Sequence, residues 1–174
     1  MLEASARGWW DSLGEHESTN ENTFTGMLDT KSYNSYFTFD LTGLMAKVTS
    51  AQLTLEEEAF FGTDTYEQLS FWDVTTDART LDADGNPLNP KIYSDLQSGT
   101  QYGVTVAYAS GVGTRLTLTL GPAALADINA ARGKSFSIGV HVDTLSGASP
   151  ARGEGVRFSN SGEYRVHQLS LNTL

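Results

Sequence analysis

Short segments in which apolar and polar residues alternate recur along the whole chain. In the segment 36–41 this alternation places Phe37, Phe39 and Leu41 on one face and the intervening side chains on the other. A period of two is typical of a β-strand with one buried face. The same period is found at 51–56, 69–74, 102–108, 115–120, 135–142 and 163–171. Because Gly-, Asn- and Pro-rich turns separate these segments, the pattern predicts an all-β, jelly-roll-like antiparallel β-sandwich.

One segment has a helical pattern instead. Pro122 suits the first position of a helix, Gly133 suits the position just past its end, and Leu125 and Ile128 share a face. We therefore predict one short helix over residues 122–132, at one end of the sandwich. Residues 76–99 have no clear strand pattern, so we expect a long surface loop there, a usual place for functional residues.

The length favours one domain. A chain of 174 residues buries about 70% of the surface that its unfolded form exposes, so it needs neither disulfides nor a structural metal. We assign residues 8–174 to a single β-sandwich domain. Residues 1–7 are expected to be a flexible N-terminal segment or a remnant of cloning. The sequence contains no cysteine, which excludes disulfides, thiolate zinc sites and cysteine nucleophiles.

The chain is acidic, with a formal net charge of −10. Such a surface repels the phosphates of nucleic acids, and the arginines are scattered from Arg7 to Arg165 without forming a basic patch. The apolar runs are too short to span a bilayer, so we expect no membrane insertion. An acidic surface is compatible with calcium and also keeps an exported protein soluble. No cofactor is expected, apart from a calcium ion.

Two parts of the chain resemble known families. Residues 34–43, which contain Phe-Asp-Leu-Thr, and residues 48–55, Val-Thr-Ser-Ala-Gln-Leu-Thr-Leu, resemble the DNRLRE-type (disaggregatase-related) β-sandwich modules of secreted and cell-surface proteins. The opening at 8–22 and the segment 122–139 are similar to ectodomains of exosortase-sorted (PEP-CTERM) bacterial proteins. These resemblances imply a secreted or cell-surface location and a non-catalytic module. Some DNRLRE-like modules bind polysaccharide.

Aromatic residues are the candidates for a binding site. Trp9 and Trp10 could present a platform on which a sugar ring stacks. Because neighbouring residues of a strand point to opposite faces, we expect one of the two rings to lie in the core and the other to be exposed. The candidate ligand contacts are Trp9, Trp10, Tyr33, Tyr36 and Trp72.

The polar stretch that follows the two tryptophans is a candidate calcium site. Carboxylates and amide carbonyls are the ligands that calcium prefers. The residues considered for it are Asp11, Glu15, Asn20 and Asn22. The spacing matches no EF-hand, and these residue types are also common in turns. The run Glu56–Glu58 could bind a cation, but we favour a solvated strand end that blocks aggregation.

Catalytic motifs are missing from the sequence. It contains neither a Gly-x-Ser-x-Gly elbow nor His-Glu-x-x-His. Whether two acids can hydrolyse a glycoside depends on the distance between them in the folded protein, and not on their separation in the sequence. The acids to test are therefore Asp40, Glu58 and Asp73, and a lyase-type pair would be His141 with Tyr108. The expectation is that the chain is not an enzyme.

Three functions remain open, in this order. The first is a non-catalytic extracellular module that binds a polysaccharide or attaches to a cell surface or matrix. The second is a self-associating structural subunit of a surface layer, filament or virion decoration. The third is an enzyme acting on polysaccharide. Exposure of Tyr33 and Tyr36 would favour a ligand, whereas their burial under a neighbouring copy would favour assembly.

Overall fold

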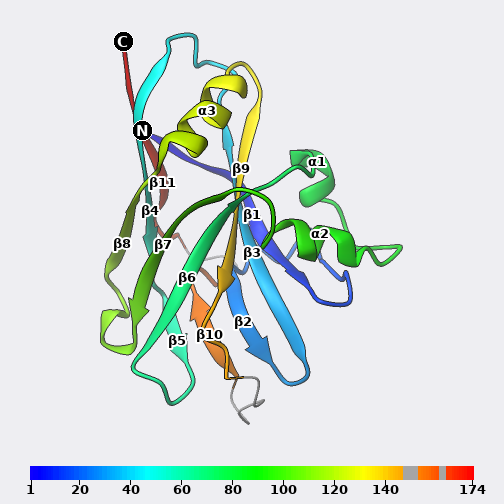
Figure 1. Cartoon of the computed structure of the whole chain (residues 1–174). Helices are drawn as coiled ribbons and strands as arrows, with labels where there is room; N and C mark the ends of the chain where they lie inside the picture. Colours follow the sequence, from blue (N-terminus) through cyan, green and yellow to red (C-terminus); the bar gives the residue numbers. More distant parts are fainter. Residues whose placement is uncertain (147–152, 161–163) are drawn as a thin grey trace.

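The computed structural model describes residues 1–146, 153–160 and 164–174, and strands account for 47% of the fold against 13% for helices. The strands are β1 (Leu2–Asp11), β2 (Phe24–Leu28), β3 (Lys31–Asp40), β4 (Val48–Glu56), β5 (Ala59–Phe61), β6 (Tyr66–Asp73), β7 (Gln101–Tyr108), β8 (Arg115–Thr119), β9 (Ser135–Val142), β10 (Glu154–Arg157) and β11 (His167–Thr173). The helices among the described residues are α1 (Ala78–Leu81), α2 (Pro90–Asp95) and α3 (Pro122–Ala130), with a 3-10 turn at Ala109–Gly111. The predicted all-β class is confirmed (Figure 1).

The strands form two antiparallel layers. In the larger layer the order is β7-β6-β9-β3-β1, and β2, β10 and β5 extend it from the beginning of β3. The smaller layer has the order β8-β4-β11. β1 joins the two layers, because Leu2 and Glu3 pair with β11 and the residues from Ala4 to Asp11 pair with β3. The expectation that residues 1–7 form a flexible segment is therefore wrong for residues 2–7.

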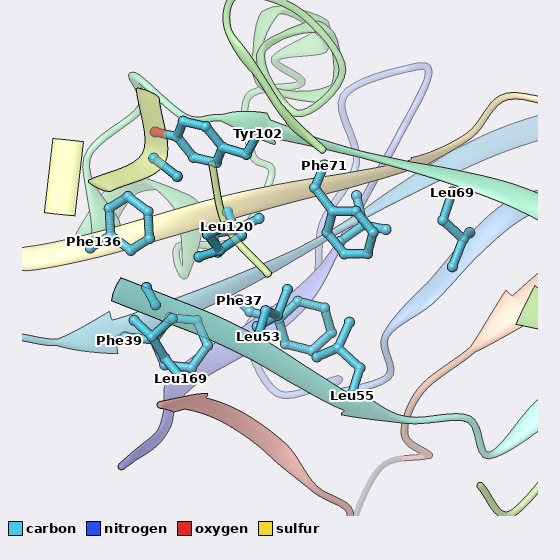
Figure 2. Close-up of a cluster of buried hydrophobic side chains, with 14 of the residues drawn as sticks. Phe37, Phe39, Leu53, Leu55, Leu69, Phe71, Tyr102, Leu120, Phe136 and Leu169 are labelled. Carbon is cyan, nitrogen blue, oxygen red and sulfur yellow. The ribbon is translucent and has the colours of Figure 1, made fainter. Parts of the chain in front are cut away.

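The hydrophobic core lies between the two layers. Figure 2 shows Phe37 of β3 and Phe71 of β6 from the larger layer close to Leu53 of β4 in the smaller one. Phe37, Phe39 and Leu41 are all fully buried, as the alternation predicted. Complete burial of such a side chain contributes roughly 1.5–3 kcal/mol. The predicted 122–132 helix is confirmed as α3, whose buried Ala124 and Ile128 join the core.

Residues 76–99 are not a simple surface loop. They contain α1 and α2, whose Leu81 and Ile92 form a second apolar cluster with Leu96, Trp10 and Tyr36. This cluster covers the outer face of β1 and β3, and both helices lie beside those strands in Figure 1. Helices of four and six residues are too short to show a helical period in the sequence. The prediction of a single helix is corrected for this reason.

Of the residues whose structure is described, none belongs to a helix long and apolar enough to cross a membrane.

The predicted strand 163–171 corresponds to β11, which begins later, at His167. Glu163 lies outside the described residues.

Candidate functional site

A pocket of about 250 Å³ opens between β1, β2, β3, β5 and β10. Trp9 pairs with Ser35 and Asp11 pairs with Tyr33, so Trp9 and Tyr33 lie on the same face of their strands. Arg7 pairs with Phe37 in the same register, which makes this the inner face of the larger layer. The lining residues are Trp9, Asn20, Asn22, Phe24, Leu28, Tyr33, Phe61 and Arg157.

Edge-to-face contacts hold the four aromatic rings of the pocket. The ring of Tyr33 lies 5.4 Å from that of Trp9 and 5.7 Å from that of Phe24, and Phe24 lies 5.4 Å from Phe61. Such pairs contribute roughly 0.5–1.5 kcal/mol each beyond the area they bury. All four side chains are half-buried, so part of each ring remains accessible. The pocket therefore offers a largely preformed apolar wall.

Polar groups are placed around this wall. The guanidinium carbon of Arg157 lies 5.4 Å from the centroid of the Phe61 ring, and the same group forms an ion pair with Glu58. Arg157 donates through Nε and Nη2 to the Glu58 carboxylate, which fixes its orientation. Asn20 accepts a hydrogen bond from the backbone N–H of Asn22 at 3.1 Å, which shapes the loop at the pocket edge. Amide and guanidinium groups thus border a wall of aromatic rings.

The aromatic residues predicted to contact a ligand lie in different parts of the structure. Trp9 and Tyr33 come together in the pocket. Trp10 and Tyr36 are 2% and 0% exposed, because α1 and α2 cover them, so the expectation that they contact a ligand is wrong. Trp10 donates from Nε1 to the carbonyl oxygen of Leu81 at 3.0 Å.

Two further observations concern the remaining aromatic candidates. Burial raises the pKa of Tyr36, and a hydrogen bond to Asp82 acts in the same direction. Trp72 is half-buried on β6, where its Nε1 donates to Ser70. It does not line the aromatic pocket. Trp72 therefore takes no part in the candidate site.

Four pocket residues were missed by the sequence analysis. Phe24 and Leu28 belong to β2, Phe61 to β5 and Arg157 to β10. These strands have five, three and four residues, which is too short for a convincing alternation. Because β10 pairs with both β2 and β5, it brings Phe24 and Phe61 together. No local feature of the sequence predicts the pairing of β10 with β2 and β5.

The four residues considered for calcium do not converge. Lys31 lies between Asp11 and Glu15 and forms an ion pair with each, at 2.9 Å from the Asp11 carboxylate. Asn20 and Asn22 instead line the aromatic pocket. Burial opposes ionisation of Asp11, but hydrogen bonds from Lys31 and two backbone N–H groups outweigh it and hold the pKa of this carboxyl below its usual value. A lysine ammonium thus occupies the position between the two acids that a calcium ion would need.

Each of the three candidate catalytic acids has a partner within the fold. Glu58 binds Arg157, Asp40 accepts the backbone N–H of Thr42 and Asp73 accepts that of Thr100. On β6, Ser70 pairs with His141 and Tyr66 pairs with Tyr108, so the two residues of the proposed lyase pair lie on opposite sides of β6 with a register offset of four residues.

The sequence matches no protein-family model and none of the curated proteins.

Proposed function

We propose that this domain binds carbohydrate in the pocket lined by Trp9, Phe24, Tyr33 and Phe61. The observation that supports the proposal most strongly is the gathering of four half-buried rings with two asparagines and an arginine around one opening. Sugars have apolar faces that stack on aromatic rings and hydroxyl groups that bind amide and guanidinium groups. The pocket supplies both kinds of partner.

The size and charge of the pocket narrow the ligand. Its volume of about 250 Å³ lies just below the roughly 300–1,000 Å³ of most small-molecule sites, which suits one sugar ring or a chain end. Glu58 neutralises Arg157, and the whole chain carries a net charge of −10. These charges disfavour a polyanionic glycan. The proposed ligand is therefore a neutral saccharide.

A secreted or cell-surface location is part of the proposal. It is supported by the resemblance of residues 34–55 to DNRLRE-type modules and of residues 8–22 and 122–139 to the ectodomains of exosortase-sorted bacterial proteins. The lack of cysteine is compatible with that location. The structural-subunit alternative is less favoured, because Tyr36 is buried by the chain's own helices and is not available for contact with a second copy.

The decisive experiment is a screen on an array of neutral glycans, followed by calorimetry with the best ligand. Trp9→Ala and Tyr33→Ala should each weaken binding at least about tenfold, because each removes one stacking surface. The matched control is Tyr108→Ala, since Tyr108 is 54% exposed on β7 and lies outside the pocket. It should bind as the unmodified chain does.

Each variant must first show an unchanged circular dichroism spectrum. The proposal would be refuted if the domain bound no glycan, or if Tyr108→Ala and Trp9→Ala lost affinity equally. Concentration-dependent growth in light scattering would favour the structural-subunit alternative instead.

A further inference from the structure

Three carboxylates meet at the end of the sandwich where β5 and β10 lie. Asp64 follows β5, Glu67 belongs to β6 and Glu154 belongs to β10. One carboxylate oxygen from each of the three residues lies within 4.8 Å of the other two. Glu67 is 0% exposed and Glu154 is 2% exposed, whereas Asp64 is open to solvent. Two acids are thus buried beside each other, with a third at the surface.

In the described part of the chain, the buried acids have no compensating positive charge. Within residues 1–146, 153–160 and 164–174, no lysine or arginine forms an ion pair with Asp64, Glu67 or Glu154. The Oε1 atom of Glu67 is buried and accepts no hydrogen bond in this part of the chain. A buried carboxylate oxygen without a partner is costly unless a cation or a proton satisfies it.

Neighbouring hydroxyl groups orient the two buried acids. Thr144 donates from its hydroxyl to Oε2 of Glu67. Ser146 donates from its backbone N–H to one oxygen of Glu154 at 2.8 Å and from its hydroxyl to the other at 2.7 Å. Burial raises the pKa of Glu67 and the nearby Glu154 and Asp64 carboxylates raise it further, although the bond from Thr144 opposes this. These hydrogen bonds therefore hold the carboxylates in orientations that suit a positively charged ligand.

We propose that Asp64, Glu67 and Glu154 bind a calcium ion. Calcium takes oxygen ligands at 2.3–2.6 Å, so oxygens on opposite sides of the ion are about 4.6–5.2 Å apart. Magnesium requires near-ideal octahedral geometry at about 2.0–2.1 Å and gives up its water reluctantly, so it should bind this site more weakly than calcium. One oxygen from each of the three carboxylates lies within 4.8 Å of the other two, so all three can reach a calcium ion placed between them. The exposed side, at Asp64, leaves room for water to complete the coordination.

This site is separate from the aromatic pocket. Glu154 pairs with Met27 and Arg157 pairs with Phe24, and three residues of separation place their side chains on opposite faces of β10. Calcium binding and saccharide binding can therefore fail independently of each other.

The first test uses the whole chain, stripped of metal with EDTA and then titrated with calcium chloride. Calorimetry should give one calcium ion per chain, and magnesium chloride should bind more weakly. At a calcium concentration of 100 times the dissociation constant, the melting temperature should rise by about 5–10 °C. No binding heat and no shift at millimolar calcium would overturn the proposal, and so would tighter binding of magnesium.

The second test uses substitutions of the acids. Glu67→Gln should weaken calcium binding at least about tenfold and raise the melting temperature of the metal-free chain, because it removes a buried acid from beside another. Glu57→Gln is the matched control, since Glu57 is equally buried but belongs to no carboxylate cluster. It should leave calcium affinity unchanged.

Asp64→Asn, at an exposed position, provides a second variant in case Glu67→Gln fails to fold. It too should weaken calcium binding. Calcium affinity unchanged in both acid variants would overturn the assignment of these residues.

Discussion

Glu57 is an ionisable side chain that is buried in the interior of the protein. The run Glu56–Glu58 was expected to be a solvated strand end. Glu56 and Glu58 are instead half-buried and bind Arg165 and Arg157, and Glu57 between them is fully buried. Neither of its carboxylate oxygens has a hydrogen-bond partner in the described part of the chain. Burial raises the pKa of Glu57 to about 7, so its side chain takes up a proton far more readily than usual.

This raised pKa gives a prediction for the variant Glu57→Gln. The unfolded chain ionises this group near pH 4.5 and the folded chain only near pH 7, so its contribution to the free energy of unfolding falls as the pH rises between those values. The glutamine variant lacks this loss. Relative to the unmodified chain it should gain about 1–3 kcal/mol between pH 4.5 and 7, with no further gain above.

The measurement must be a difference between the two proteins at each pH. Burial lowers the pKa of His167 to about 4, so this residue destabilises the fold as the pH falls from 6.5 towards 4. Its slope opposes that of Glu57 in the same range, but it is common to both proteins and cancels. Urea titrations that give a pH-independent difference would contradict the prediction.

Residue by residue, the sequence could say which aromatic rings share a face but not which face is covered. Alternation correctly separated Trp9 from Trp10. It could not show that Leu81 and Ile92, some seventy to eighty residues away, would cover Trp10 and leave Trp9 half-exposed. Two of the five predicted ligand contacts are therefore in the pocket, and two are in a second core.

At the level of elements, the success of prediction depended on length. The predicted segments 36–41 and 135–142 correspond to the second half of β3 and to β9, and side chains expected to face the core, such as Phe37 and Ile138, are buried. The pocket, however, is completed by β2, β5 and β10, which are too short for their period to be recognised. The fold class was therefore predictable, whereas most of the candidate site depended on long-range pairing of short strands.

The packing of the α1–α2 segment on the sheet can be tested at one glycine. A Cβ atom added to Gly139 of β9 would lie 2.4 Å from the carbonyl oxygen of Leu96, at the end of α2. Since backbone and not a flexible side chain stands in the way, Gly139→Ala should push this segment off the sheet. The expected loss is about 1–3 kcal/mol in the free energy of unfolding, with increased solvent exposure of Trp10.

Chemical denaturation and tryptophan fluorescence measure both effects. Gly43→Ala is the matched control, because a Cβ atom there would meet no atom within 4 Å. Equal stability of the two alanine variants would show that the segment does not depend on close contact at Gly139.

The whole molecule depends on β1 to hold its two layers together. Leu2 and Glu3 pair with β11 of the smaller layer, and the strand then passes to β3 of the larger one through a bulge between Ala4 and Ala6. Figure 1 accordingly shows the beginning of the chain beside β11. Without this part of β1, both layers would present an unpaired edge, which favours aggregation.

Deletion of residues 1–7 should therefore destabilise the entire sandwich. It removes the backbone pairs of Leu2, Glu3, Ala4, Ala6 and Arg7. At roughly 0.5–1.5 kcal/mol for each hydrogen bond, the loss is roughly 3–7 kcal/mol, a large part of the roughly 5–15 kcal/mol that stabilises a typical domain. Calorimetric melting should show a large fall in melting temperature, or the shortened chain should aggregate. Deletion of Leu174, which is 84% exposed, is the control and should have little effect. A shortened chain that melts like the full one would mean that the other strand pairings alone hold the layers together.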